Sequence, residues 1–318
     1  MAQIWPIGGG KGGTGKSFLA GSLGICLARK GKRTLLVDAD FGAANLHTII
    51  GVPHPEKSLS DFINKNVRNL EETIVETPSP ELYLISGARN NLDIANLAYE
   101  QKMKIMRAIS KLPFEYILLD LGAGTSFNTI DFFLISDQGI FITTPEPTSI
   151  ENIYRLIRSV YLRKIRQVIK AHDFKTLIQE ALKRDKNTAI DYLHQLLSIL
   201  KELDQGKGII LEQSLQDLRF KLVVNQFRKH DNPSLGVLMC RILEKHLGIN
   251  IQFLGNISFD DRVHDAVCKK TPFVSKYPYT QTAIDLQEFC NHMLTIREEL
   301  PPLTGSSYGI TVSSAALD

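Results

Sequence analysis

Two lysines lie within a glycine-rich stretch at residues 8–20, GGGKGGTGKSFLA. Lys16 and Ser17 complete the spacing G-x-x-x-x-G-K-S that starts at Gly10, which is the spacing of a phosphate-binding loop. Glycines let backbone N–H groups converge on phosphate oxygens, and the N-terminus of a following helix adds partial positive charge. We expect Lys16 to contact the β- and γ-phosphates and the Ser17 hydroxyl to bind Mg²⁺. The residues predicted to bind the nucleotide in this loop are Gly10, Gly12, Gly13, Thr14, Gly15, Lys16, Ser17 and Phe18.

Three carboxylates follow apolar segments that are typical of strands. Asp38 and Asp40 end the run LLVDAD, and Asp120 ends the run YILLD. An acid in such a place can hold Mg²⁺ through water, and another one near a triphosphate can orient the attacking water. Each is also compatible with an ordinary polar strand end. Their combination with the glycine-rich loop favours a site for a nucleotide and its metal ion.

The apolar runs that carry these residues are short and do not alternate with polar residues. Unbroken apolar strands are typical of a parallel sheet that helices cover on both faces. We predict strands at 33–38, 81–86, 116–120, 139–144, 221–225 and 251–257, and helices at 16–30, 91–110, 126–136, 233–247 and 279–299. The expected fold class is therefore α/β, a doubly wound and mostly parallel sheet with its site at the carboxyl ends of the strands.

The stretch between the fourth and fifth of these strands is too long for one crossover helix. It is rich in Leu, Ile, Lys, Arg and Gln, and we predict a helical insertion at residues 156–219. The insertion would lie within a single domain of residues 1–300. Residues 301–318 are small and mostly polar, and we expect a disordered tail there.

Four motifs together resemble the MinD/ParA group of deviant Walker A ATPases, and most of all its FlhG branch. They are KGGTGKS at 11–17, DADFGAAN at 38–45, DLGAG at 120–124 and TTPEPTSI at 143–150. The resemblance extends over residues 1–155 and 219–295. It implies a P-loop NTPase fold of the SIMIBI type, with ATP or ADP and Mg²⁺ as cofactors.

The resemblance also assigns roles to single residues. Lys11 matches the signature lysine that reaches across an ATP-sandwiched homodimer to the phosphates of the partner subunit, although a solvated loop charge is the alternative interpretation. Lys16 is the second cation expected to take part in catalysis, and Asp40 matches the residue that positions the attacking water. Ser17, Asp38 and Asp120 match positions at the metal. Asn225, at the end of KLVVN, matches the position that reads the adenine amino group; a polar strand cap is the alternative.

Composition limits the remaining classes of protein. The chain has 318 residues, a net charge of +3 and four widely spaced cysteines, so neither a disulfide framework nor an Fe–S site is expected. The chain shows neither a secretory signal nor an apolar run long enough to cross a membrane. We therefore expect a cytoplasmic protein, with recruitment to a pole or surface depending on a partner.

A basic stretch accompanies the predicted insertion. Residues 151–186 contain ten Lys or Arg and four Asp or Glu. This excess is compatible with binding to nucleic acid, to acidic lipid or to a protein, or with a solvated helix face, and a protein partner docked on 156–219 is the first choice. The last predicted helix carries Glu288, Glu298 and Glu299, unlike a basic amphipathic anchor, so a stable membrane anchor is not expected.

The leading functional hypothesis is an ATP-dependent dimerisation switch with slow, Mg²⁺-dependent hydrolysis. Such a switch would position or regulate a cellular assembly such as a flagellum or pilus. The alternatives are a phosphotransferase related to bacterial tyrosine kinases, a ParA-like partition ATPase that binds the nucleoid, and a nucleotide-binding scaffold without turnover. The tail holds Tyr308 but no tyrosine cluster, which disfavours the kinase hypothesis.

Overall fold

The computed structural model describes residues 2–42, 44–53, 55–87, 97–172 and 201–298. Within them the strands form an eight-stranded sheet in the order β3-β4-β2-β5-β1-β6-β7-β8, and all neighbours are parallel except β3 and β4. The strands are β1 Gln3–Gly8, β2 Thr34–Ala39, β3 Ile74–Glu76, β4 Leu82–Ile85, β5 Tyr116–Leu121, β6 Gln138–Thr143, β7 Arg219–Phe227 and β8 Gln252–Ser258. This confirms the predicted α/β class and its mostly parallel sheet.

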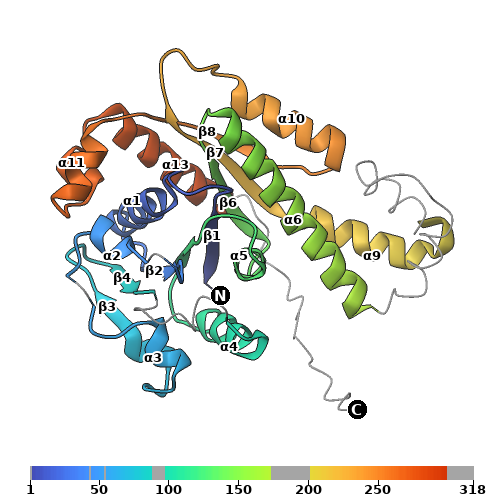
Figure 1. The fold of residues 1–318 in the computed structure, drawn as a ribbon, viewed down its shortest axis with the longest axis horizontal. Coiled ribbons are helices and arrows are strands. Elements are labelled where there is room, and N and C mark those ends of the chain that lie inside the picture. The colour runs from blue at the N-terminus through green and yellow to red at the C-terminus, as the bar shows by residue number, and fades with distance from the viewer. Residues whose placement is uncertain (1, 43, 54, 88–96, 173–200, 299–318) are drawn as a thin grey trace.

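Helices cover both faces of the sheet, and each face has its own apolar core (Figure 1). The longer helices α1 (Lys16–Arg29) and α13 (Gln281–Glu298) pack on one face. The other face carries α4 (Tyr99–Ile109), α5 (Phe127–Phe133), α6 (Pro147–Ala171) and α10 (Leu235–Leu247), and α9 (Gln205–Gln216) packs beside α6. Short helices connect them: α2 Leu46–Ile49, α3 Leu59–Ile63, η1 Leu70–Thr73, α11 Arg262–Cys268 and α12 Phe273–Lys276.

The predicted elements differ from the observed ones mainly at short segments. Each predicted strand overlaps an observed one, but β1, the antiparallel edge strand β3 and the short helices have no counterpart among the predicted ranges. The region proposed as an insertion begins inside α6, which runs unbroken from Pro147 to Ala171 and buries a stripe of apolar residues against the sheet. Residues 173–200 of that region, and the tail at 301–318, lie outside the described residues. Within the described part of the chain, no helix combines the length and the apolar character needed to cross a bilayer.

A buried ion-pair cluster joins the three helices that cover the centre of the sheet. Asp131 of α5 accepts two hydrogen bonds from Arg163 of α6, at 2.7 and 3.0 Å, and another from Lys102 of α4. The side chains of Asp131 and Lys102 are each 6% exposed. Lys164 pairs with Asp137 at the surface. Two cations of the basic stretch are therefore neutralised by acids outside it, which corrects the simple charge count.

Asp131→Asn is expected to lower the free energy of unfolding by about 3 kcal/mol, because it leaves two largely buried cations without a counter-charge. Asp137→Asn is the matched control, since it removes the acid of an exposed pair and is expected to cost less than about 1 kcal/mol. Urea unfolding followed by circular dichroism measures both values. Equal losses in the two variants would contradict a structural role for the cluster.

Candidate nucleotide site

The predicted phosphate loop connects β1 to α1. Gly13 and Gly15 have φ angles of 80° and 91°, in the left-handed region that favours glycine. A Cβ on Gly10 would lie 2.2 Å from the carbonyl carbon of Asn152, so α6 passes directly over the loop. α1 begins at Lys16, and the N–H groups of a helical first turn have no intrahelical acceptors. The loop can therefore present several backbone donors to an anion.

The side chain of Phe18 does not face the predicted nucleotide site. Its side chain is buried in the core and its ring packs edge-on against that of Phe273, with centroids 5.5 Å apart. The group that Phe18 can offer a nucleotide is its backbone N–H in the first turn of α1.

Lys16 and Asp120 form the buried polar centre of the site. The Lys16 side chain is almost fully buried; burial lowers its pKa, while nearby Asp120 and Asp40 raise it. The pKa of Asp120 is raised to about 6 overall. Burial is the main cause and the charge of Asp40 adds to it, while a hydrogen bond from the Ser17 hydroxyl and the charge of Lys16 act in the opposite direction. Asp120 Oδ1 is buried and has no hydrogen-bond partner among the described residues. This oxygen is therefore available for a ligand from outside the chain.

Asp38 lies beside Asp120 because β2 and β5 pair in parallel with these two residues in register. Its Oδ1 accepts from the Asp40 N–H at 3.2 Å, and its Oδ2 accepts from the Leu46 N–H at 3.0 Å. Burial and the charge of Asp120 raise the pKa of Asp38 well above its ordinary value. Asp38 thus holds the backbone of Asp40 and of Leu46 at the end of β2. Asp40 lies next to the loop after β5, where a Cβ on Gly122 would be 3.3 Å from its Oδ1.

The side-chain oxygens of Ser17 and Asp120 are suitable ligands for a Mg²⁺ ion that binds together with a nucleotide. Mg²⁺ takes one or two protein carboxylates and completes its shell with phosphate oxygens and water. Ser17 and Asp120 provide a hydroxyl and a free carboxylate oxygen side by side. The described residues contain no group of three or more His, Cys, Asp or Glu that would hold a metal alone. With a bound ion, the site would supply charge neutralisation at the phosphates.

Lys11, the extra lysine, lies outside this buried centre. Its Nζ is 3.0 Å from Glu146 Oε2 and 3.4 Å from Thr148 Oγ1, at the start of α6. The side chains of Lys11 and Glu146 are 43% and 61% exposed. Sequence reasoning did not identify Glu146 as a site residue, although it lies within the quoted motif TTPEPTSI. The two lysines of the loop thus have different surroundings, one buried beside carboxylates and one at the surface.

Asn225 is brought to the loop, but its amide contacts the loop backbone. Its side chain is buried, and Nδ2 donates to the carbonyl of Thr14 at 2.8 Å. The next residue, Gln226, donates from Nε2 to the carbonyl of Gly13 at 2.9 Å. Gln226 was not identified from the sequence, and no motif points to it.

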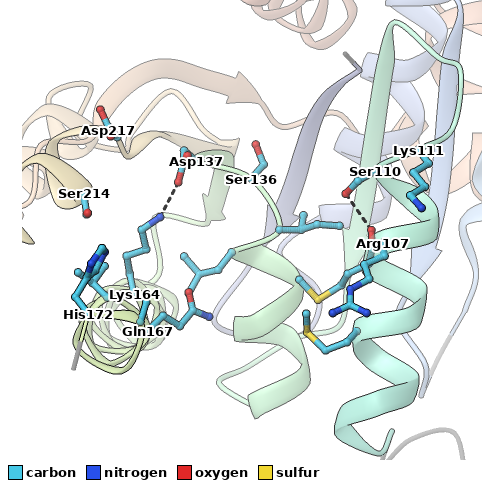
Figure 2. A pocket seen from close by; sticks show the side chains of 16 residues that line it. Arg107, Ser110, Lys111, Ser136, Asp137, Lys164, Gln167, His172, Ser214 and Asp217 are labelled. Atoms are coloured by element: carbon cyan, nitrogen blue, oxygen red, sulfur yellow. Dashed lines mark hydrogen bonds and ion pairs between the residues drawn. The ribbon is translucent and has the colours of Figure 1, made fainter. Parts of the chain in front are cut away.

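A separate pocket of about 660 Å³ contains none of the predicted site residues (Figure 2). It lies among α4, α6 and α9. Ser136 and Asp137, which line it, directly precede β6, and Asp217 precedes β7. The pocket is therefore at the amino ends of the strands, the edge opposite to the phosphate loop.

Comparisons with known proteins agree with this geometry. The CobQ/CobB/MinD/ParA nucleotide binding domain family matches residues 6–273. The septum site-determining protein MinD of Buchnera aphidicola subsp. Schizaphis graminum is 25% identical over 234 residues, which are 67% of this chain and 86% of that protein. The antiactivator FleN of Pseudomonas aeruginosa is 21% identical over 285 residues, which are 89% of this chain and 82% of FleN.

A solved structure of Pyrococcus horikoshii MinD complexed with Mg-ADP has the same fold. It aligns with a TM-score of 0.64 and 18% identity, and covers 93% of this chain and 98% of that one. At this level of identity the likeness concerns the fold.

The raised pKa of Asp120 leads to a prediction with a definite sign. Its folded value of about 6 lies above its unfolded value of about 4, so stability from this group is present below pH 4 and is lost as the pH rises through 6. Asp120→Asn is expected to raise the unfolding free energy of the nucleotide-free protein by about 3 kcal/mol at pH 8, and by roughly half as much at pH 5.

Thermal and urea unfolding at the two pH values measure this difference. Asp217→Asn, which removes an exposed carboxyl far from the loop, is the control and should show no such pH dependence. Destabilisation by Asp120→Asn at pH 8 would mean that its ionised carboxylate is fully compensated within the chain.

Proposed function

The chain belongs to the CobQ/CobB/MinD/ParA family of nucleotide-binding domains, and we propose that it is a Mg²⁺-dependent ATPase that works as a dimerisation switch. ATP and Mg²⁺ occupy the loop at residues 10–18, with Lys16 on the phosphates and Ser17 and Asp120 at the metal. Asp40 positions the attacking water. The buried, unpartnered Oδ1 of Asp120 beside the Ser17 hydroxyl is the observation that carries the metal-nucleotide assignment.

The placement of Lys11 supports coupling of hydrolysis to dimerisation. A cation at a developing γ-phosphoryl charge accelerates phosphoryl transfer. Lys16 occupies the interior of the loop, while Lys11 lies at the exposed rim and is held by a surface ion pair with Glu146. Surface ion pairs of this kind contribute about 1 kcal/mol or less, so a partner's triphosphate can displace it. Lys11 then acts across the interface of an ATP-sandwiched homodimer.

The relatives support a role in positioning or regulating a cellular assembly. One relative is a septum site-determining protein and another is an antiactivator. We propose a flagellum, pilus or similar polar structure as the assembly, and a protein partner that docks on residues 156–219. The neutralised Arg163 and Lys164 favour a protein partner over nucleic acid, because fewer charges remain for a phosphate backbone. The protein would act in the cytoplasm, recruited to a pole or surface by that partner.

The solution mass of the full chain tests the switch. Light scattering with Mg-ADP and with Mg-ATP is expected to give a monomer with ADP, and a dimer with ATP in Asp40→Ala, which retains its nucleotide. The dimer is expected to be lost in the Lys11→Ala, Asp40→Ala double variant. Lys30→Ala in the Asp40→Ala background is the matched control, because it removes another exposed lysine that lies at the opposite end of α1.

Loss of the dimer in the Lys30→Ala control as well would show that charge alone governs association. A monomer in every nucleotide state would contradict the switch and leave the tyrosine-kinase-like or scaffold alternatives.

A further inference from the structure

Two neighbouring side chains near the end of β7 donate hydrogen bonds to the backbone of the phosphate loop. Asn225 Nδ2 donates to Thr14 O at 2.8 Å, and Gln226 Nε2 donates to Gly13 O at 2.9 Å. Two consecutive residues of a strand thus bind two consecutive carbonyls of the loop. A Cβ on Gly15 would lie 2.2 Å from Asn225 Nδ2, so the strand end and the loop are in close contact.

Gln226 adopts a strained backbone conformation at this contact. Its φ angle is 57°, in the left-handed region, which costs a non-glycine residue about 1 kcal/mol or more. Successive side chains of a regular strand point to opposite faces. The register between β7 and β8 shifts between Val224 and Phe227, and this irregularity lets both amides reach the loop. Strain of this kind persists where the surrounding structure requires it, often at ligand-binding sites.

The geometry of the peptide bond gives the two contacts a consequence for phosphate binding. In a trans peptide the carbonyl of one residue and the N–H of the next point in opposite directions. The Gly13 carbonyl shares its peptide plane with the Thr14 N–H, and the Thr14 carbonyl shares its plane with the Gly15 N–H. Because both carbonyls are held toward β7, both N–H groups are held away from β7. Unpaired N–H groups of such a loop are what bind phosphate oxygens.

We propose that Gln226, together with Asn225, is a positioning residue that pre-orients the Thr14 and Gly15 N–H groups for the phosphates of the nucleotide. The inference rests on the proposed function, since it concerns nucleotide bound at the same loop. Gln226 does not touch the phosphates; it acts through the Gly13 peptide. The hydrogen bond from Gln226 Nε2 to Gly13 O lowers the conformational entropy that the loop loses when the nucleotide binds.

Substitutions at Gln226 separate the hydrogen bond from the backbone conformation. Gln226→Gly keeps the left-handed backbone without strain but removes the donor. Gln226→Asn also tolerates this backbone, but its amide is one methylene too short to reach Gly13 O. Gln226→Glu keeps the length and replaces the donor by a carboxylate. Lys65→Gly is the matched control, because Lys65 has a φ of 61° in the turn after α3, away from the loop.

The affinity for mant-ADP with Mg²⁺, measured by fluorescence, is the first measurement. A neutral hydrogen bond contributes about 1 kcal/mol, so Gln226→Gly and Gln226→Asn are expected to weaken binding about five-fold, and Gln226→Glu more strongly. Lys65→Gly should bind like the wild type. With ATP, Gln226→Gly is expected to raise KM by a similar factor and to leave kcat within about two-fold, because the contact acts in binding. Melting temperatures establish that each variant is folded.

Wild-type affinity in Gln226→Gly and Gln226→Asn would overturn the inference and leave Gln226 as a local backbone feature. A lowered kcat at unchanged KM would overturn it too, because the contact would then act in the chemical step. Failure of the wild-type protein to bind mant-ADP is a different result: it would contradict the proposed function itself, and the inference with it.

Discussion

Burial of negative charge beside the phosphate loop is the constraint on which the site depends. The register of β2 and β5 places Asp38 and Asp120 next to each other, and both are almost completely shielded from water. Burial of two carboxylates is unfavourable unless positive charge or hydrogen bonds compensate. Backbone N–H groups compensate Asp38, whereas Asp120 has the Ser17 hydroxyl, Lys16 and one free oxygen. A divalent cation bound with a nucleotide would complete this arrangement, which links metal binding to the stability of the site.

The loop that carries Lys16 is held in place by three neighbouring elements. The loop after β5 donates from the Gly124 N–H to Gly9 O at 3.1 Å, α6 passes over Gly10, and the end of β7 binds the carbonyls at Gly13 and Thr14. These contacts come from segments far apart in the sequence and meet because the carboxyl ends of parallel strands share one edge of the sheet (Figure 1). The start of α6 also supplies Glu146 and Thr148, which hold Lys11 at the surface. Helix α6 therefore packs against the loop at Gly10 and also holds the Lys11 side chain in place through hydrogen bonds.

Much of this arrangement could be predicted from the sequence. Unbroken apolar runs gave the central strands, because helices cover both faces of the sheet, and the glycine spacing gave the loop. The short elements β3, α2 and α3 were not predicted, since three to five residues carry no clear periodicity. The partners Glu146 and Gln226 were missed for a different reason: each acts through a tertiary contact with a residue more than a hundred positions away. The start of α6 at Pro147 was not predicted either: helical structure was expected only from residue 156 on, and the single helix to residue 171 depends on packing against the sheet.

Mixing two inactive variants tests most directly whether Lys11 acts across a dimer. In a dimer of Lys11→Ala with Asp40→Ala, the nucleotide on the Lys11→Ala subunit has an intact Asp40 and faces the intact Lys11 of the other subunit. Each mixed dimer then has one complete site, so mixing should restore ATP turnover up to roughly a quarter of the wild-type value, although each variant alone is inactive. If Lys11 acts within its own chain, every site in the mixture lacks one of the two residues. Turnover in the mixture no higher than in the separate variants would contradict the account.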